Sequence, residues 1–535
     1  MIAIIHWYPS SLAELTGIFQ ELGHDLLGEL RARLKAWWET DTLDAEARRS
    51  PLVLVVVCPK VRHAGAAPEA IDIWAFITGC TLEEVGAKIG IWQPNEGHLC
   101  PFIFVDDAKR GEDVLLELLN PSFQLDRDMA AKLNGLERAL TPSIAAVGLG
   151  ALGSQVAMNL VRSGFGKWVF IDDDPLMPHN VARHALNAHH VGWQKSIVMA
   201  EAAKCVIPED NAFSAIPADV MAPGKEAEKL SDALKNADLI LDMSASVSVE
   251  RSLVLDIDSS ARRASLFLTP TGDDLVLLAE DKARALKLDE LEMQYYRAII
   301  TEETLSGHFK PSQGRRRYGQ SCRDITSTLP QDLVALHSAI ASRAIREIFT
   351  WDRASITVWR ADPLGNVKRV DVPFHPAFHQ KMGGWKVCTD AKLLSKLHQL
   401  REERLPNQTG GVLLGSFDLD RHLVYIVDAT PSPPDSEEWP TLYIRGCRGL
   451  KLQVERVSRE TDGSLEYIGE WHSHPVGAPT APSNDDRQVF VWLAELMGRD
   501  GLPALMLIVG DNAEVSCFLG EMRAQENLIS PPTES

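Results

Sequence analysis

Two histidines and a downstream carboxylate form the pattern in this sequence that most clearly predicts chemistry. In the stretch 470–475, Glu-Trp-His-Ser-His-Pro, His472 and His474 are two residues apart, so on a β-strand their imidazoles share one face. Asp486 follows at the start of a predicted helix over 485–497, where its carboxylate can join the two imidazoles. Two imidazoles and a carboxylate bind zinc and leave a fourth position open, which is typical of catalytic zinc sites.

Each half of this pattern also has an ordinary structural interpretation. Paired histidines are common surface or core residues, and Ser483 with Asp486 has the spacing of a helix capping box. Together, the order His-x-His-Pro and then Ser-x-x-Asp resembles the JAMM (JAB/MPN) metallopeptidase family. The resemblance implies that His472, His474 and Asp486 bind Zn²⁺. It also implies that Ser483 stabilises the oxyanion of the tetrahedral intermediate, and that the substrates are amide bonds after the C-terminal glycine of ubiquitin-like proteins.

One residue departs from the family pattern. In the family, a glutamate two residues before the Gly-Gly-x-Leu-x-Gly strand accepts a proton from the attacking water, and this sequence has Gln408 at that position, before Gly410. An amide has the shape of a carboxylate but cannot act as a base. Glu402 and Glu403 are nearby, but they lie upstream of the strand. We therefore expect a zinc-binding module with impaired hydrolysis, whether Gln408 is natural or was introduced to trap a complex.

A glycine-rich turn between a predicted strand over 144–147 and a helix predicts a phosphate site. Its glycines let the backbone approach a phosphate, and the helix N-terminus favours the negative charge. A second strand over 168–171 ends in Asp172, where a carboxylate can bond ribose hydroxyls. These features alone would fit a dehydrogenase equally well. The glycines of the turn are Gly148, Gly150 and Gly153.

The residues that follow favour adenylation instead. The order D-x-D, N-x-x-R and G-x-x-K resembles the ThiF/MoeB/E1 superfamily, which adenylates the C-terminal carboxylate of ubiquitin-like or sulfur-carrier proteins. The resemblance implies that Asp172 holds the ribose of ATP and that Asp174 lies near Mg²⁺. It assigns the triphosphate to Asn180, Arg183 and Lys195.

The adenylation pattern also has one gap and one candidate nucleophile. The family motif D-x-x-D-N keeps only Asp242 here, with Ala245 at the second acidic position, so either Asp242 takes the metal role or phosphate and Asp174 hold the magnesium. Cys322 follows the basic run 315–317 and precedes a predicted helix over 333–348. Neighbouring cations lower the pKa of a thiol, so Cys322 resembles the cysteine that receives the activated carboxylate, although a buried structural cysteine remains the alternative.

Composition limits the remaining classes of partner. The chain has 535 residues and a formal net charge of -20, which disfavours binding to nucleic acid or to an anionic membrane surface. The longest apolar run, 52–58, is far shorter than the roughly 18 residues of a membrane helix, and the N-terminus lacks a signal-peptide pattern. We therefore expect a cytoplasmic protein. The eight cysteines are scattered, so no disulfide framework is expected.

The expected fold class is α/β, with a Rossmann-like ThiF/E1 adenylation domain, an α+β JAB/MPN metalloprotease domain and a small N-terminal α/β domain. A long helix is predicted over 12–38, and short strands over 102–105 and 453–457. The predicted boundaries are an N-terminal domain of unknown role (1–138), the adenylation domain (139–365), a linker (366–388), the JAMM domain (389–525) and a disordered tail (526–535).

The fusion as a whole resembles the E1–JAB proteins of bacterial ubiquitin-like conjugation operons, for which antiviral defence is one context. By that resemblance the partners are a ubiquitin-like (β-grasp) protein and an E2-like carrier protein, and the chain forms a homodimer in which Arg127 reaches the other subunit. Two alternatives remain open. One is sulfur-carrier activation to a thiocarboxylate with trimming of the carrier, and the other is a non-catalytic scaffold that binds a ubiquitin-like protein.

Overall fold

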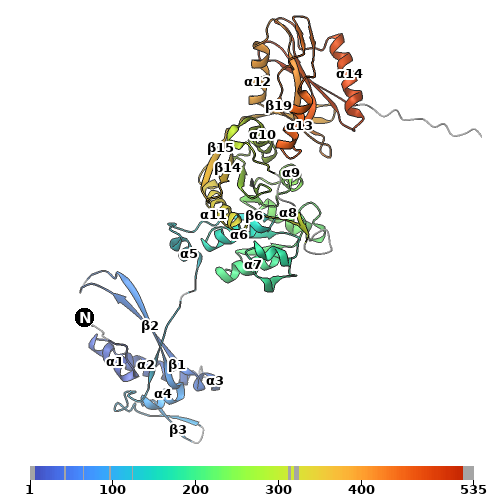
Figure 1. The fold of residues 1–535 in the computed structure, drawn as a ribbon. Helices are drawn as coiled ribbons and strands as arrows, with labels where there is room; N and C mark the ends of the chain where they lie inside the picture. The colour runs from blue at the N-terminus through green and yellow to red at the C-terminus, as the bar shows by residue number, and fades with distance from the viewer. Residues whose placement is uncertain are drawn as a thin grey trace, which may run out of the picture. The chain divides into compact units, whose positions relative to one another are not determined.

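The computed structural model describes residues 7–40, 44–63, 66–95, 98–122, 124–310, 315–317 and 325–521. Its contacts divide the chain into two compact units, Met1–Gln124 and Leu125–Ser535 (Figure 1). The sequence predicts that the N-terminal domain extends to residue 138. In the structure, helix α5 (Arg127–Leu133) already belongs to the second unit.

The first unit packs helices against one face of an antiparallel sheet of order β1-β2-β5. The predicted single helix over 12–38 is two helices, because Gly23 adopts a φ of 87° and Asp25 caps the second helix through the Gly28 N–H. The predicted strand over 102–105 is irregular backbone. The elements are α1 (Leu12–Glu21), α2 (Leu26–Glu39), α3 (Ala45–Arg49), β1 (Pro51–Lys60), β2 (Ala70–Thr81), α4 (Leu82–Lys88), β3 (Trp92–Asn95), β4 (His98–Pro101) and β5 (Leu116–Leu119).

The second unit begins with a doubly wound sheet of order β15-β14-β11-β10-β9-β6-β7-β8. The chain runs outward through β6, β7 and β8 and returns to place β9 on the other side of β6, so the order of the parallel strands reverses between β6 and β9. Ligands of such sheets bind at this switch point. The elements are β6 (Ser143–Val147), α6 (Ala151–Arg162), β7 (Lys167–Ile171), α7 (Lys195–Val206), β8 (Phe213–Ile216), α8 (Ala227–Lys235), β9 (Leu239–Asp242), α9 (Val247–Leu255), β10 (Arg262–Leu268), β11 (Asp274–Ala279), α10 (Leu288–Thr301), β12 (Arg315–Arg317), β13 (Ile325–Ser327), α11 (Gln331–Ile348), β14 (Ser355–Ala361) and β15 (Val367–Val372).

A second mixed sheet of order β16-β17-β19-β18-β22-β23-β24 follows, with α12 and α14 on opposite sides of it (Figure 1). The stretch 366–388, expected as a linker, instead forms β15 of the first sheet and β16 and β17 of the second. The elements are β16 (Ala377–Met382), β17 (Trp385–Asp390), α12 (Ala391–Glu402), β18 (Gly410–Asp418), β19 (Leu423–Ala429), β20 (Glu437–Trp439), β21 (Leu442–Ile444), α13 (Leu450–Glu460), β22 (Glu466–Ser473), α14 (Asn484–Gly498), β23 (Ala504–Val509) and β24 (Val515–Gly520).

The prediction of a strand over 453–457 is wrong, because these residues lie inside helix α13. Val454 and Val457 are three residues apart, and on a helix both can face the same core. Glu455 and Arg456, which lie between them, are exposed. A short apolar run is therefore ambiguous between strand and helix until its packing partner is known.

Helix α10 joins the two sheets of the second unit (Figure 1). Every residue from Leu288 to Ile299 is buried, and the apolar ones share one core with Val276 of β11 and Tyr425 of β19. A helix buried all round needs partners for its charged side chains. Those partners come from the neighbouring elements, as in the contact of Arg297 Nη1 with Asp390 Oδ2 at 2.6 Å.

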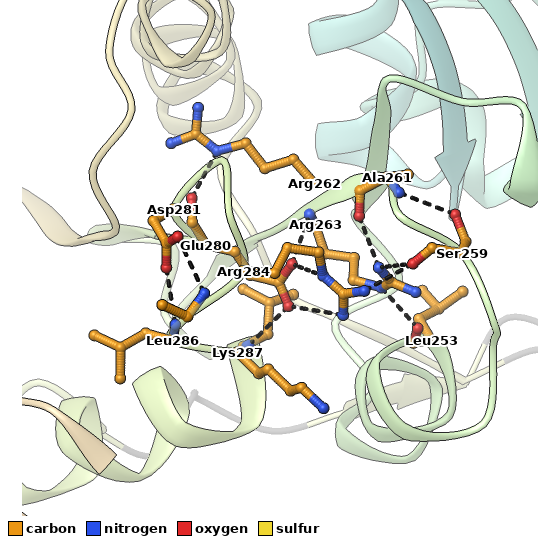
Figure 2. Close-up of polar contacts among 12 residues, drawn as sticks. Leu253, Ser259, Ala261, Arg262, Arg263, Glu280, Asp281, Arg284, Leu286 and Lys287 are labelled. Atoms are coloured by element: carbon orange, nitrogen blue, oxygen red, sulfur yellow. Dashed lines mark hydrogen bonds and ion pairs between the residues drawn. The ribbon is translucent and has the colours of Figure 1, made fainter.

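The start of α10 is fixed by a buried polar cluster (Figure 2). Glu280 accepts hydrogen bonds from the backbone N–H groups of Arg263 and Leu288 and from the guanidinium of Arg284. The fully buried guanidinium of Arg263 in turn donates to main-chain carbonyls that end the preceding helix and loop. Those carbonyls belong to Leu253, Ile257, Ser259 and Ala261.

Arg127 does not project from the second unit toward another subunit. Its guanidinium is buried and donates to the carbonyls of Gly164 and Gly166 at 3.0 and 2.6 Å, and to the carboxylate of Glu209. All three partners belong to the same chain. The expectation of a cross-subunit role for Arg127 is therefore wrong, because its donors are occupied in closing the turn before β7.

A search of the described residues for a helix long and apolar enough to cross a membrane finds none.

Candidate functional sites

The side chains of His472, His474 and Asp486 meet at one point, as predicted. His472 lies on β22 and His474 directly follows the strand, while Asp486 lies in the first turn of α14. The two Nε2 atoms are 3.3 Å apart, and the carboxylate oxygens of Asp486 lie 3.0 Å from His472 Nε2 and 3.3 Å from His474 Nε2. Three ligand atoms at these separations can be bridged by one small cation.

The surrounding bonds orient these side chains for metal binding. His474 Nδ1 lies 2.6 Å from the carbonyl oxygen of Pro479, so Nδ1 carries a proton and Nε2 is the nitrogen that faces Asp486 and can coordinate a metal. Burial alone would raise the pKa of Asp486, but hydrogen bonds from His472 and His474 outweigh it and hold that pKa well below its usual range. The same contact with Asp486 raises the pKa of His474. A permanently anionic oxygen and a fixed tautomer fit zinc.

Ser483 caps the helix that carries Asp486. Its hydroxyl accepts the Asp486 N–H at 3.1 Å, and its own N–H donates to Asp486 Oδ2 at 2.7 Å, which completes a capping box. The hydroxyl proton is not used in either bond. It therefore remains available to an oxygen of a bound substrate.

Arg401 supports the site from α12, and sequence patterns gave no sign of it. Its buried guanidinium donates to the backbone carbonyl of His474 at 2.9 Å and to Asp511 Oδ1. The other oxygen of Asp511 accepts the N–H of Gly477 at 2.6 Å. Arg401 and Asp511 together hold both ends of the turn that follows His474.

These side chains line a cleft of about 740 Å³ between the β20–β21 hairpin and α14. Both walls carry exposed apolar side chains, Ile444 on the hairpin and Val489 and Trp492 on α14. Such walls suit a partner protein better than a small polar molecule. The lining includes Gln408, Leu442, Tyr443, Ile444, Glu470, His472, His474, Ser483, Asp485, Asp486, Val489 and Trp492.

Gln408 lines this cleft beside the histidines, and its backbone N–H donates to the carbonyl of Trp439 in the hairpin. Glu402 and Glu403 end α12, are exposed and do not line the cleft. Glu470 does line it, two residues before His472 on the same face of β22. However, its carboxylate is held by Arg445 at 3.0 and 3.2 Å and accepts the Tyr467 hydroxyl.

A second cavity of about 230 Å³ lies at the switch point between β6 and β9. The turn after β6 can lie there only because Gly148 has a φ of 84° and no side chain, since a Cβ would come within 2.5 Å of the Ser244 nitrogen. Gly153 lets the helix begin close by, since its Cβ would lie 2.2 Å from the Gly148 oxygen. The predicted residues that line the cavity are Gly148, Gly150, Asp172, Asp174 and Lys195.

Two side chains hold the backbone of Leu149 within this turn, one at its N–H and one at its C=O. Asp172 Oδ2 accepts its N–H at 2.7 Å, and His184 Nε2 lies 2.7 Å from its carbonyl oxygen. Burial lowers the pKa of His184 to about 4, so the ring is neutral and donates through Nε2. Sequence reasoning missed His184, although it directly follows the predicted Arg183.

Lys195 begins α7 and points into the cavity with its charge already paired. Its Nζ lies 3.0 Å from Asp174 Oδ2 and 3.7 Å from Asp172 Oδ1. A bound polyphosphate could exchange for these carboxylates. Asp219 and Ser244 also line the cavity and were not predicted.

The other predicted nucleotide residues are not among the described residues that line the cavity. Asn180 accepts the Met177 N–H through its side-chain oxygen, and Arg183 Nη1 donates to the Leu329 carbonyl at 3.3 Å. Asp242 is buried under the turn after β9, where it accepts the Ser244 N–H. Burial raises its pKa to about 6. Cys322 lies outside the described residues.

Two family models match separate parts of this chain. Residues 125–257 match the ThiF family, and residues 390–521 match the prokaryotic homologs of the JAB domain. The chain is a fusion of an E1-like ThiF domain and a JAB domain. The ThiF match contains the cavity at the switch point, and the JAB match contains the three clustered ligands and their cleft.

The curated relatives of this ThiF–JAB fusion have names of two kinds, an isopeptidase and a ubiquitin transferase-like protein. The "CD-NTase/cGAS isopeptidase" of Enterobacter hormaechei subsp. hoffmannii (strain UCI 50) is 40% identical over 104 residues, which cover 19% of this chain and 56% of the relative. The "ATP-dependent ubiquitin transferase-like protein Cap2" of Vibrio cholerae serotype O1 is 30% identical over 125 residues, 21% of this chain and 20% of the relative. The chain thus spans about half the length of one relative and about a fifth of the other.

Solved structures give partial matches. The structure of PaaA aligns with 46% of this chain and 66% of its own at 12% identity and a TM-score of 0.31. The complex of E. coli MccB with ATP aligns with 43% of this chain and 64% of its own at 13% identity and a TM-score of 0.29.

Replacing Arg401 with alanine should weaken zinc binding by the JAB part. The turn after His474 would lose the donor that holds its carbonyl, and loss of such a supporting contact typically costs about 10–100-fold in metal affinity. Competition with a chromogenic zinc chelator measures this affinity. Arg499→Ala, an exposed arginine at the end of α14, is the matched control. Equal affinity in both folded variants would remove Arg401 from the site.

Replacing Asp242 with asparagine should stabilise the ThiF part at neutral pH. A pKa of about 6 in the folded state, against an ordinary 3.8, makes wild-type stability fall as pH rises from about 4 to 6 and stay lower above that. An asparagine would avoid this loss and still accept the Ser244 N–H. Denaturant unfolding should show a gain of up to about 3 kcal/mol at pH 7.5 that largely disappears near pH 4.

The exposed Asp232 provides the comparison for this measurement. Asp232→Asn should leave the free energy of unfolding within about 0.5 kcal/mol of wild type at both pH values. A destabilised Asp242→Asn at pH 7.5 would mean that the charged carboxylate is favoured in the folded protein.

Proposed function

We propose that this chain activates the C-terminal carboxylate of a ubiquitin-like protein with ATP and binds the same kind of tail at a zinc site in its JAB part. The observation that carries the proposal is the presence, in one folded unit, of a glycine turn with Lys195 and of three clustered side chains that could hold zinc beside a cleft. The names of the relatives, a ubiquitin transferase-like protein and an isopeptidase, support the same pairing.

In the ThiF part, the glycine turn and Lys195 would hold the triphosphate of ATP. A carboxylate oxygen of the tail would attack the α-phosphorus, forming the acyl-phosphate bond while pyrophosphate leaves with the bonding electron pair. Lys195 would exchange its bond to Asp174 for a phosphate oxygen and so offset the charge that develops there. Asp174 would then face Mg²⁺, a role that the burial of Asp242 does not favour.

Activation should depend on Lys195 and not on another lysine of the same helix. Lys195→Met should lower ATP–pyrophosphate exchange, measured with the partner protein present, by about 10²-fold or more, because a charge aimed at the reacting phosphate is lost. Lys204→Met is the matched control, since Lys204 is on α7 but is more exposed and pairs with Glu201, away from the cavity. Exchange that survives in Lys195→Met at the control rate would reject adenylation at this cavity.

Several finer parts of the proposal rest on the family resemblance. Cys322 would receive the activated carboxylate as a thioester, an E2-like carrier would take it onward, and the chain would act as a homodimer. A thiocarboxylate product in place of a reducible thioester would instead favour sulfur-carrier activation.

In the JAB part, zinc would polarise the carbonyl of the scissile amide and lower the pKa of a bound water. His472, His474 and Asp486 would hold the ion, and the Ser483 hydroxyl would donate to the carbonyl oxygen as negative charge develops on it. The exposed wall of Val489 and Trp492 would contact the globular body of the partner while its tail enters the cleft.

Hydrolysis itself would be slow because of Gln408. Its amide cannot take the proton of the attacking water, and the carboxylate of Glu470 is occupied by Arg445. Asp485, the remaining described carboxylate of the cleft outside the ligand set, is exposed in the first turn of α14. The JAB part would therefore bind a tail more readily than cut it.

Gln408→Glu should raise cleavage of a ubiquitin-like protein fused through its terminal glycine by about 10²–10⁴-fold, the usual contribution of a general base. Zinc content should stay the same in both forms, because Gln408 is not a ligand. Gln408→Ala controls for the change in shape and should remain slow. Substantial, equal cleavage by wild type and Gln408→Glu would show that another group accepts the proton.

A further inference from the structure

A second cluster of metal-ligating side chains lies where the ThiF part meets the JAB sheet. It consists of Glu290 in the first turn of α10, His379 on β16 and Cys388 on β17. One ligand atom from each side chain, a carboxylate oxygen, an imidazole nitrogen and the thiol sulfur, lies within 4.8 Å of the other two. None of the three lines the nucleotide cavity or the cleft beside His472.

We propose that Glu290, His379 and Cys388 bind a second metal ion, which their ligand chemistry assigns to zinc. A thiolate, an imidazole and a carboxylate are the three side-chain ligands that proteins use for zinc, and sulfur disfavours magnesium and calcium. The site is separate from the family's histidine–aspartate site and contains the sulfur that the other lacks.

The backbone brings these ligands together. His379 and Cys388 are direct partners in the antiparallel β16–β17 pair, so their side chains leave the same face of the hairpin side by side. Glu290 reaches them from α10, with one carboxylate oxygen accepting the Lys287 N–H at 2.9 Å and the other 2.7 Å from His379 Nε2. That contact resembles the one between Asp486 and His472, 3.0 Å, in the JAB site.

There is room for a fourth ligand beside the cluster. A cavity of about 10 Å³ is lined by Glu290, Cys388, Thr389 and Tyr425, close to the roughly 10–15 Å³ that one water molecule needs. A water bound to the ion in this cavity would complete four-coordination.

Charge also favours a cation here. Glu290 is 3% exposed, and among the described residues no lysine or arginine forms an ion pair with it. On binding, a bond forms from zinc to Cys388 sulfur as the S–H bond breaks and its proton passes to solvent, while Glu290 supplies an oxygen and His379 the Nε2 lone pair. The thiolate and carboxylate then neutralise both charges of the ion. Zinc would thereby cross-link α10 to the β16–β17 hairpin at the edge of the JAB sheet.

The test is the zinc content of the full chain together with the spectrum of its cobalt-substituted form. Wild type should hold two zinc ions, and Cys388→Ser and His472→Ala should each hold one. Co²⁺ in wild type and in His472→Ala should give a thiolate-to-cobalt charge-transfer band in the near ultraviolet, which Cys388→Ser should lack. The JAB ligands contain no sulfur, so this band reports only the proposed site.

Two further variants keep the result interpretable. Cys517→Ser removes a buried thiol of the same sheet that belongs to neither ligand cluster of the described residues, and it should keep both ions and the band. His379→Ala changes a partly exposed residue, so it should remove one ion even if Cys388→Ser misfolds. One zinc per wild-type chain that disappears in His472→Ala, with no thiolate band, would mean that Glu290 and His379 form only a hydrogen-bonded pair.

Discussion

The burial of α10 between two sheets is the constraint on which the second unit depends. Arg297 of α10 pairs with Asp390 at the start of α12, and Glu292 of α10 pairs with Arg251 of α9 at 2.7 Å. Removing one partner of such a buried pair typically costs about 3–5 kcal/mol, because the other charge is left uncompensated. Since these partners come from both sides of the helix, the ThiF and JAB parts cannot separate without leaving charges unpaired.

The connection through α10 limits how the ThiF and JAB parts could act on the same partner protein. A flexible linker would let the zinc cleft swing toward the nucleotide cavity, but the predicted linker is instead strand within both sheets. If both sites act on the same tail, the partner must therefore move between them, and neither site can be brought to it by rotation of a domain. Activation and tail binding would then be alternatives for any one partner molecule.

The residues that sequence alone identified are those whose partners are close in the chain. The three candidate zinc ligands span fifteen positions and the glycine turn spans six, so local strand and helix geometry places them. Arg401 and Asp511 could not be found this way, because they support His474 from distant segments through one main-chain carbonyl and one N–H. Asp242 fits its motif, yet its burial beneath Ser244 depends on how β9 packs. The strand predicted over 453–457 was wrong for a similar reason, because the sequence alone does not show which core its apolar residues pack against.

Metal binding and hydrolysis would place different demands on the JAB cleft. Binding needs ligand atoms at fixed positions, and the bond from His474 Nδ1 to the Pro479 carbonyl directs Nε2 toward the other two ligands. Hydrolysis also needs a carboxylate that is near the ion and not already engaged. Glu470 lies on the same face of β22 as His472. However, its carboxylate makes a bidentate contact with Arg445, which stabilises its charge and occupies both of its oxygens. On the proposed function, a glutamine at position 408 would remove the proton acceptor without disturbing the three candidate ligands, and the cleft could still hold a tail.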